Sequence, residues 1–133
     1  TEIYTLSLHD ALPICIDGLI KKSKSNLKVV EDWVAKTDWI EFLADDPKVR
    51  SNTSVCLNVI HPKVAAMGPD EKSKFLKSIT SDLSKKNIAH DINSYKEAPA
   101  GYRFWCGPTV EESDLKVALA ELEKVFNEKV KNL

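Results

Sequence analysis

The fold of this chain is decided by one stretch, Arg50-Ser51-Asn52-Thr53-Ser54-Val55-Cys56-Leu57-Asn58-Val59-Ile60. From Thr53 onward, apolar and polar side chains alternate with a period of two, which is typical of a half-buried β-strand. The apolar residues Val55, Leu57 and Val59 therefore share one face. We predict that this stretch is the central strand of a sheet, because the amphipathic helices predicted on both sides of it can cover its apolar face.

The other elements are predicted from helical spacing, turn residues and aromatic runs. Gly68-Pro69 is expected to begin a helix, and Thr109 is expected to cap another through a capping box with Glu112. The aromatic run at residues 102–106 is typical of a strand. In chain order, we predict a helix over residues 16–36, a short helical turn near 39–44, the central strand over 53–60, a helix over 69–86, strands over 88–92 and 102–106, and a helix over 110–129.

The order of these elements predicts the fold class. The last two strands are separated by a short loop, so we expect them to pair as a hairpin. Helices that cover a small, mostly antiparallel sheet make an α+β fold. At 133 residues, the chain is long enough for one domain with a substantial core.

Composition excludes several classes of partner. The net charge of −1 produces no global field that would attract nucleic acid or an anionic membrane. No apolar run approaches the roughly 20 residues that a membrane helix needs. Cys15, Cys56 and Cys106 form an odd set without metal-ligand spacing, and we expect free thiols in a reducing compartment, the cytoplasm.

We interpret residues 1–14 (TEIYTLSLHDALPI) as a segment whose origin differs from that of the rest of the chain. They match the translation of a common sequencing-library adapter in one reading frame. We therefore expect a non-native segment over residues 1–14 and the natural protein over residues 15–133. A genuine N-terminal strand and turn is the alternative.

Arg103 is the main candidate for binding chemistry. It lies among aromatic residues of a predicted strand, where an unpaired charge would be costly. Its planar guanidinium can hold a carboxylate through two hydrogen bonds, and that carboxylate can belong to a ligand or to the protein. The pattern alone favours a structural salt bridge.

Two further residues are weaker candidates for substrate binding. Arg50 precedes the central strand and can hold an anionic ligand or pair with Asp45 or Asp46. His90 lies in a predicted strand, where a structural histidine is the commoner outcome. The sequence shows no phosphate-binding glycine loop, metal-ligand cluster or nucleophile elbow, so no catalytic, cofactor-binding or metal-binding residue is assigned.

Several motifs together resemble phosphoserine aminotransferase, a class V enzyme of fold type I that uses pyridoxal phosphate. The resemblance extends from about residue 16 to the C-terminus. It rests on residues 32–37 (DWVAKT), Trp39, 42–44 (FLA), Asp46-Pro47, 50–57 (RSNTSVCL), 98–107 (APAGYRFWCG) and 109–111 (TVE).

This resemblance implies the C-terminal small domain of a homodimeric transaminase. The family exchanges an amino group between glutamate and 3-phosphohydroxypyruvate in serine biosynthesis, with the cofactor on a lysine of a larger domain. No lysine of this chain matches that motif, so the chain alone is expected to be inactive. The family's carboxylate-binding arginine corresponds to Arg103.

One departure keeps alternatives open. Many members of the family carry a His-Arg pair that contacts the substrate phosphate, whereas this chain has Ala89-His90-Asp91 and a longer loop through residues 95–97. A class V transaminase with another keto acid is therefore one alternative. A stand-alone regulatory module that binds a small molecule is the other.

Overall fold

The computed structural model describes the backbone of residues 8–133 and the side chains of residues 16–133. The expected adapter-derived segment, residues 1–14, lies outside the described side chains, and its origin stays a prediction. The elements in chain order are α1 (Leu8–Val34), β1 (Ile40–Phe42), the 3-10 helix η2 (Pro47–Val49), β2 (Ser54–Val59), α2 (Pro62–Ala65), α3 (Pro69–Lys85), β3 (Gly101–Trp105) and α4 (Glu112–Lys131).

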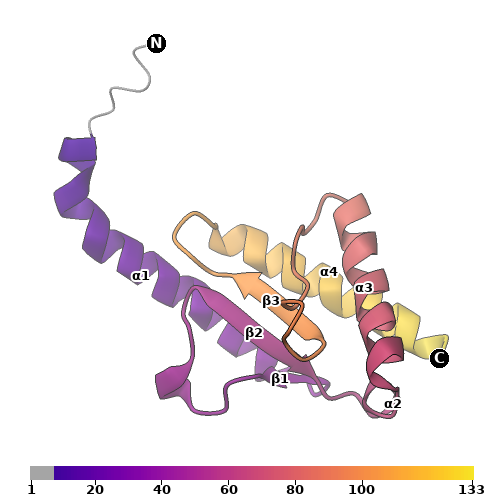
Figure 1. The fold of residues 1–133 in the computed structure, drawn as a ribbon. Helices are drawn as coiled ribbons and strands as arrows, with labels where there is room; N and C mark the ends of the chain where they lie inside the picture. Colours follow the sequence, from indigo (N-terminus) through magenta and orange to yellow (C-terminus); the bar gives the residue numbers. More distant parts are fainter. Residues whose placement is uncertain (1–7) are drawn as a thin grey trace.

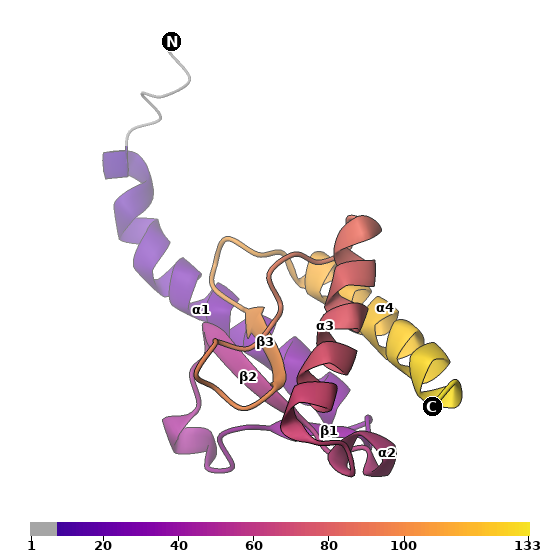
Figure 2. The same cartoon turned by 45° about the vertical axis from the view of Figure 1, so that its right-hand side comes forward.

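The predicted α+β class is confirmed. The three strands form one antiparallel sheet in the order β1-β2-β3. In Figure 1, α1 and α4 pass behind the strands and α3 stands beside α4, an arrangement that the turned view of Figure 2 supports. The helix α4 contacts both α1 and α3. No described helix is both long and apolar enough to cross a membrane.

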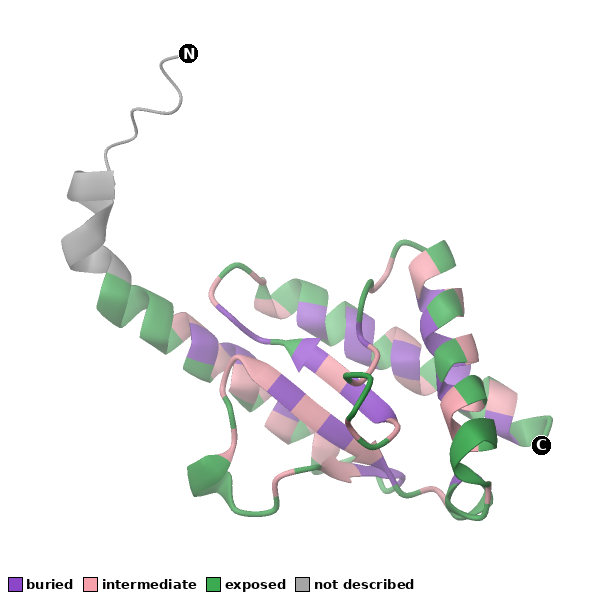
Figure 3. Cartoon of the chain, viewed as in Figure 1, coloured by how far each residue is buried: buried purple, intermediate pink, exposed green. Residues whose placement is uncertain are grey.

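The central position of β2 is also confirmed. Leu57 lies opposite Phe42 of β1 and Tyr102 of β3, so all three share the inner face of the sheet. The alternation appears directly as buried and half-buried residues along β2 (Figure 3). Burial of Val55, Leu57 and Val59 against the helices supplies the hydrophobic free energy that holds the strand in this register.

The predicted first residue of α3 is correct, and the predicted ends of α4 each differ from the observed ends by two residues. Pro69 begins α3 after Gly68, and Asp70 and Glu71 lie in its first turn, where the helix dipole favours acids. The expected capping box of α4 is wrong: Glu111 is the N-cap residue and makes no side-chain capping bond. The hydroxyl of Thr109 instead accepts a hydrogen bond from Trp105 Nε1 at 3.1 Å.

The predicted helical turn at residues 39–44 is wrong, because this segment forms β1. Ile40 pairs with Val59, and the amide of Ile60 donates to the Trp39 carbonyl at 2.8 Å. The Trp39 ring stacks on Phe126 of α4 with 3.7 Å between ring centroids. Trp39 is therefore a packing residue.

The predicted strand over residues 88–92, and its hairpin with β3, are also wrong. Asp91 has φ 54°, a left-handed conformation that interrupts an extended strand. Only one bridge, Asn93 to Tyr102, joins this segment to β3, and β3 pairs mainly with β2. Asn87 follows the C-cap of α3 with φ 55°, a left-handed conformation that often ends a helix.

A buried asparagine ties the first helix to the segment before the last one. Asn26 of α1 is fully buried, and its Nδ2 donates to the carbonyls of Cys106, Gly107 and Val110 at 3.2, 3.1 and 2.9 Å. These carbonyls lie outside regular structure and need donors because they are shielded from water. We call these three hydrogen bonds the Asn26 clasp. They fix the point at which the chain leaves β3 and runs towards α4.

Candidate functional site

Arg103 lies on the outer face of the sheet, away from the helices. It stands opposite Cys56 in the β2–β3 ladder, between the buried inner-face residues Tyr102 and Phe104. Its side chain is only 16% exposed. The alternation of β3 therefore directs a guanidinium outward while the aromatic neighbours on either side anchor the strand.

The segment between α3 and β3 folds over Arg103. The amide of Arg103 donates to the Ile92 carbonyl at 2.9 Å, which holds this segment against the edge of β3. Asp91 Oδ2 lies 3.0 Å from Arg103 Nη2, and the Tyr95 ring centroid lies 4.5 Å from Arg103 Cζ. Arg103 is thus bordered by a carboxylate and stacked on an aromatic ring.

Asp91 and Tyr95 were not predicted as part of this site. The turn residues of the 93–101 loop indicated a loop but did not show which of its side chains meet Arg103. An aspartate preceding the loop and an aromatic residue inside it are the signals that could have suggested partners for an exposed-face arginine.

The electrostatics of the site leave Arg103 able to bind an anion. The Asp91 side chain is 86% exposed, so the ion pair is screened by water and contributes little to stability. Arg103 Nε is buried and has no hydrogen-bond partner among the described residues. A carboxylate ligand can therefore replace or join Asp91 at modest cost, and the guanidinium retains donors for it.

Arg50 lies at the other edge of the sheet, so the structure does not bring it together with Arg103. Its guanidinium stacks 3.6 Å from the Phe42 ring centroid of β1. Its nitrogens donate to the Ala44 carbonyl at 3.1 Å and to Glu31 at 3.4 Å. The acidic partner is Glu31 on α1, whereas Asp45 contributes only its backbone carbonyl. A ligand contact by Arg50 stays a prediction.

His90 directly precedes Asp91 in the chain, but its ring bonds elsewhere. Its Nδ1 lies 2.8 Å from the hydroxyl of Ser84 on α3. This contact fixes the imidazole against the end of α3 while the residue stays exposed. Binding of substrate by His90 likewise stays a prediction.

The two cysteines whose side chains the structure describes, Cys56 and Cys106, are free thiols. Cys106 is fully buried, and burial raises the pKa of its thiol to about 12. Cys56 is a half-buried free thiol beside Arg103 on the sheet. Within the described part of the chain, no group of three or more His, Cys, Asp or Glu residues is placed to hold a metal ion.

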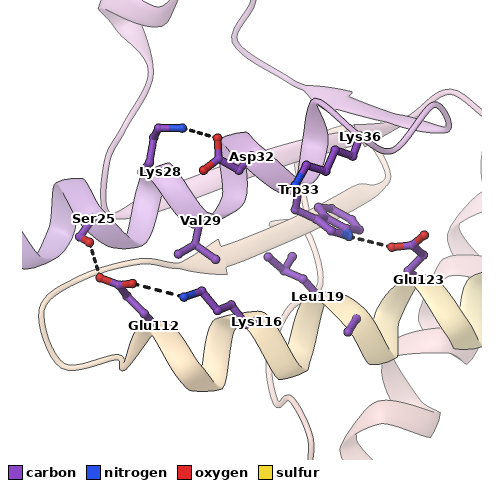
Figure 4. A pocket seen from close by; sticks show the side chains of 11 residues that line it. Ser25, Lys28, Val29, Asp32, Trp33, Lys36, Glu112, Lys116, Leu119 and Glu123 are labelled. Carbon is purple, nitrogen blue, oxygen red and sulfur yellow. Dashed lines mark hydrogen bonds and ion pairs between the residues drawn. The ribbon is translucent and has the colours of Figure 1, made fainter.

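A groove with a volume of about 450 Å³ lies between α1 and α4, away from Arg103 (Figure 4). Its charged side chains other than Lys36 have polar or charged partners. Ser25 donates to Glu112, Lys28 pairs with Asp32, and Trp33 Nε1 donates to Glu123 at 3.1 Å. Of these bonds, Ser25–Glu112 and Trp33–Glu123 cross the groove and tie α1 to α4.

Comparisons with known proteins extend these observations. No family model matches the chain. A phosphoserine aminotransferase of Methanosarcina barkeri is 41% identical over 109 residues, which are 82% of this chain and 27% of the relative. A phosphoserine aminotransferase of Methanosarcina mazei is 38% identical over the same shares of each chain. The match thus spans about a quarter of the length of these curated relatives.

Solved structures show the same fold. The TDC of Oryza sativa, solved with PLP and tryptamine, matches with a TM-score of 0.66 at 20% identity, over 85% of this chain and 23% of that one. A phosphoserine aminotransferase from Cytophaga hutchinsonii matches with a TM-score of 0.59 at 19% identity, over 87% and 28%. The chain is thus partially homologous to phosphoserine aminotransferase and has the fold of a portion of fold-type-I pyridoxal-phosphate enzymes.

Proposed function

We propose that residues 15–133 are the C-terminal small domain of a phosphoserine aminotransferase-like enzyme. The intact enzyme would transfer an amino group between glutamate and 3-phosphohydroxypyruvate, and it would work as a homodimer. The partial homology to the two Methanosarcina enzymes supports this proposal. Because the chain spans about a quarter of those relatives, most of the catalytic machinery is assigned to the remainder of the intact enzyme.

Within this function, Arg103 is the residue that binds the substrate α-carboxylate. The observation that carries this role is its geometry: a mostly buried guanidinium on the outer face of the sheet, stacked on Tyr95, whose ion-pair partner among the described residues is the exposed carboxylate of Asp91. Such an arginine holds a planar carboxylate by two parallel hydrogen bonds. Fixing that end of an amino acid orients its amino group for reaction.

Pyridoxal phosphate is the cofactor proposed for the intact enzyme, and it would supply the electron sink for amino transfer. The residues around Arg103 do not make a site for it. The strand residues on the same face are Glu41, Ser54, Cys56, Asn58 and Trp105, and none carries a primary amine for covalent attachment. This chain therefore contributes substrate orientation, and we assign no cofactor-binding residue to it.

Substitution of Arg103 in the intact enzyme tests the proposal. Arg103→Lys keeps the charge but loses the paired geometry, and Arg103→Ala loses both. A hydrogen bond to a charged group contributes about 1.5–3 kcal/mol, so glutamate affinity should fall about ten- to a hundredfold in the glutamate half-reaction. The melting temperature should change little, because the Asp91 pair is exposed.

A purely structural Arg103 predicts the opposite pattern. The melting temperature would then fall, while the enzyme that remains folded would bind glutamate normally. Normal glutamate affinity in a folded Arg103→Ala enzyme would remove Arg103 from the substrate site.

A transaminase acting on another keto acid is a second candidate, favoured by the absence of a His-Arg pair from residues 89–97. A comparison of kcat/KM for phosphorylated and unphosphorylated keto acids distinguishes the two. The gene upstream of residue 15 tests the regulatory-module alternative. A long reading frame with a cofactor-lysine motif supports the enzyme, whereas an immediate start codon supports the module.

A further inference from the structure

A cavity of about 640 Å³ lies between the first half of α3 and the loop before β3. We call it the lysine cavity, because Lys72, Lys77 and Lys96 line it. Ser73, Ser94 and Tyr95 also contribute to its wall, and no carboxylate does. Its volume falls within the range of about 300–1,000 Å³ that is common for small-molecule sites.

The three ammonium groups have no acidic partner in the part of the chain that the structure describes. None of them lies within 4.0 Å of a carboxylate oxygen there. Lys72 Nζ instead donates to the Val59 carbonyl at 3.0 Å and to Asn58 Oδ1 at 3.4 Å. These neutral acceptors position the ammonium group but leave its charge uncompensated.

Two other concave regions of the molecule are lined by acidic side chains as well as lysines. The groove between α1 and α4 contains three lysines and also Asp32, Glu112 and Glu123. A hollow between α3 and α4 mixes Lys85, Lys86 and Lys129 with acids. Because like charges around one cavity repel, an anion bound in the lysine cavity would lower the electrostatic energy.

The chemistry of the wall indicates the class of ligand. Lysine binds phosphate as a compact point charge, and serine hydroxyls can donate to its remaining oxygens. We propose that the lysine cavity binds the phosphate monoester group of a small phosphorylated ligand. Its identification as the phosphorylated keto acid rests on the proposed function, whereas anion binding by the cavity does not.

Tyr95 connects the lysine cavity to Arg103. It lines the cavity, and its ring also stacks 4.5 Å from Arg103 Cζ. Lys77 lies on a wall shared with a neighbouring hollow that Asp91, the partner of Arg103, also lines. A phosphate in the cavity and a carboxylate on Arg103 would therefore occupy adjoining sites.

Titration of this chain with inorganic phosphate at constant ionic strength tests the proposal. In ¹H–¹⁵N spectra, saturable shifts are expected at residues 72–77 and 94–100. Lys77→Gln and Lys96→Gln replace exposed side chains. Each should weaken phosphate binding about three- to tenfold, because an exposed charge contributes a modest amount. The same spectra report whether each variant is folded.

Lys74→Gln is the matched control, because Lys74 is an exposed lysine of α3 that does not line the cavity. It should leave the phosphate affinity unchanged. Shifts that do not saturate, or an equal loss in Lys74→Gln, would overturn the proposal. Loss of phosphate binding would not affect the glutamate test of Arg103, so the two proposals fail separately.

The intact enzyme provides the second measurement. Lys96→Gln should raise the KM for the phosphorylated keto acid about three- to tenfold. An unchanged KM for the phosphorylated keto acid would overturn the assignment of this cavity to the substrate phosphate.

Discussion

At the scale of single residues, Gly101 lies where β2 and β3 leave no room for a side chain. It stands opposite Asn58, and a Cβ atom added to it would lie 2.2 Å from the Leu57 carbonyl oxygen. Because that oxygen belongs to the backbone of the central strand, the ladder must shift to accept a side chain. Gly101→Ala should lower the free energy of unfolding by about 1–3 kcal/mol, measured by urea unfolding.

Gly18 provides the matched control. It lies in α1, and a Cβ added there meets no atom within 4 Å. Gly18→Ala should raise the free energy of unfolding by about 0.5–1 kcal/mol, because alanine loses less backbone entropy in a helix. A destabilisation by Gly18→Ala, or a neutral Gly101→Ala, would contradict this account of the β2–β3 contact.

Sequence reasoning found Arg103 but not its surroundings. An arginine between aromatic residues of a strand is a local signal, visible within five residues. The lysine cavity has no such signal, because Lys72 and Lys96 are 24 positions apart and meet only after the loop folds back on α3. The structural partner of Arg50 was missed for the same reason, since Glu31 lies on another element.

At the scale of elements, the contact between α3 and α4 should weaken in acid. A hydrogen bond from Lys129 Nζ, 2.8 Å from Asp82 Oδ2, lowers the pKa of the Asp82 carboxyl below its ordinary value of 3.8. The unfolded chain therefore binds more protons in acid. The stabilisation is present above about pH 4 and is lost as the pH falls through the folded-state pKa.

Thermal unfolding of the chain and of Asp82→Asn, at a series of pH values from about 7 down to about 2, measures this effect. The variant should be less stable near neutrality and should lose less stability on acidification. Parallel pH profiles for the two proteins would show that Asp82 does not link the helices.

An element could be predicted from the sequence when its pattern lies within the element itself. The helix α3 carries its own periodic pattern and start signal, and β2 carries its own alternation. The helix α1 carries a periodic pattern, but it begins at Leu8 and not at the predicted residue 16. The strand β1 has three residues, and its identity depends on pairing with Val59 across a loop. Residues 88–92 do not form the predicted strand. The apolar residues Ile88 and Ile92 favoured a strand in the sequence, but Asp91 adopts a left-handed conformation that the local sequence does not indicate.

At the scale of the whole molecule, we expect no transaminase activity from this chain alone. Amino transfer needs a cofactor held against the substrate, and a carboxylate anchor cannot supply that by itself. Purified chain mixed with pyridoxal phosphate and glutamate should turn over no faster than the free cofactor. An unrelated lysine-rich protein controls for imines on surface lysines, and turnover above both references would refute the expectation.

The Asn26 clasp has a consequence for how the chain folds during synthesis. Within this domain, the helix α1 is synthesised before the carbonyls that Asn26 binds and before α4, which belong to residues 106–131. Until those residues leave the exit tunnel, the apolar stripe of α1 has no final partner. The domain is therefore expected to acquire its native structure in a single late step, once residues 106–131 have emerged.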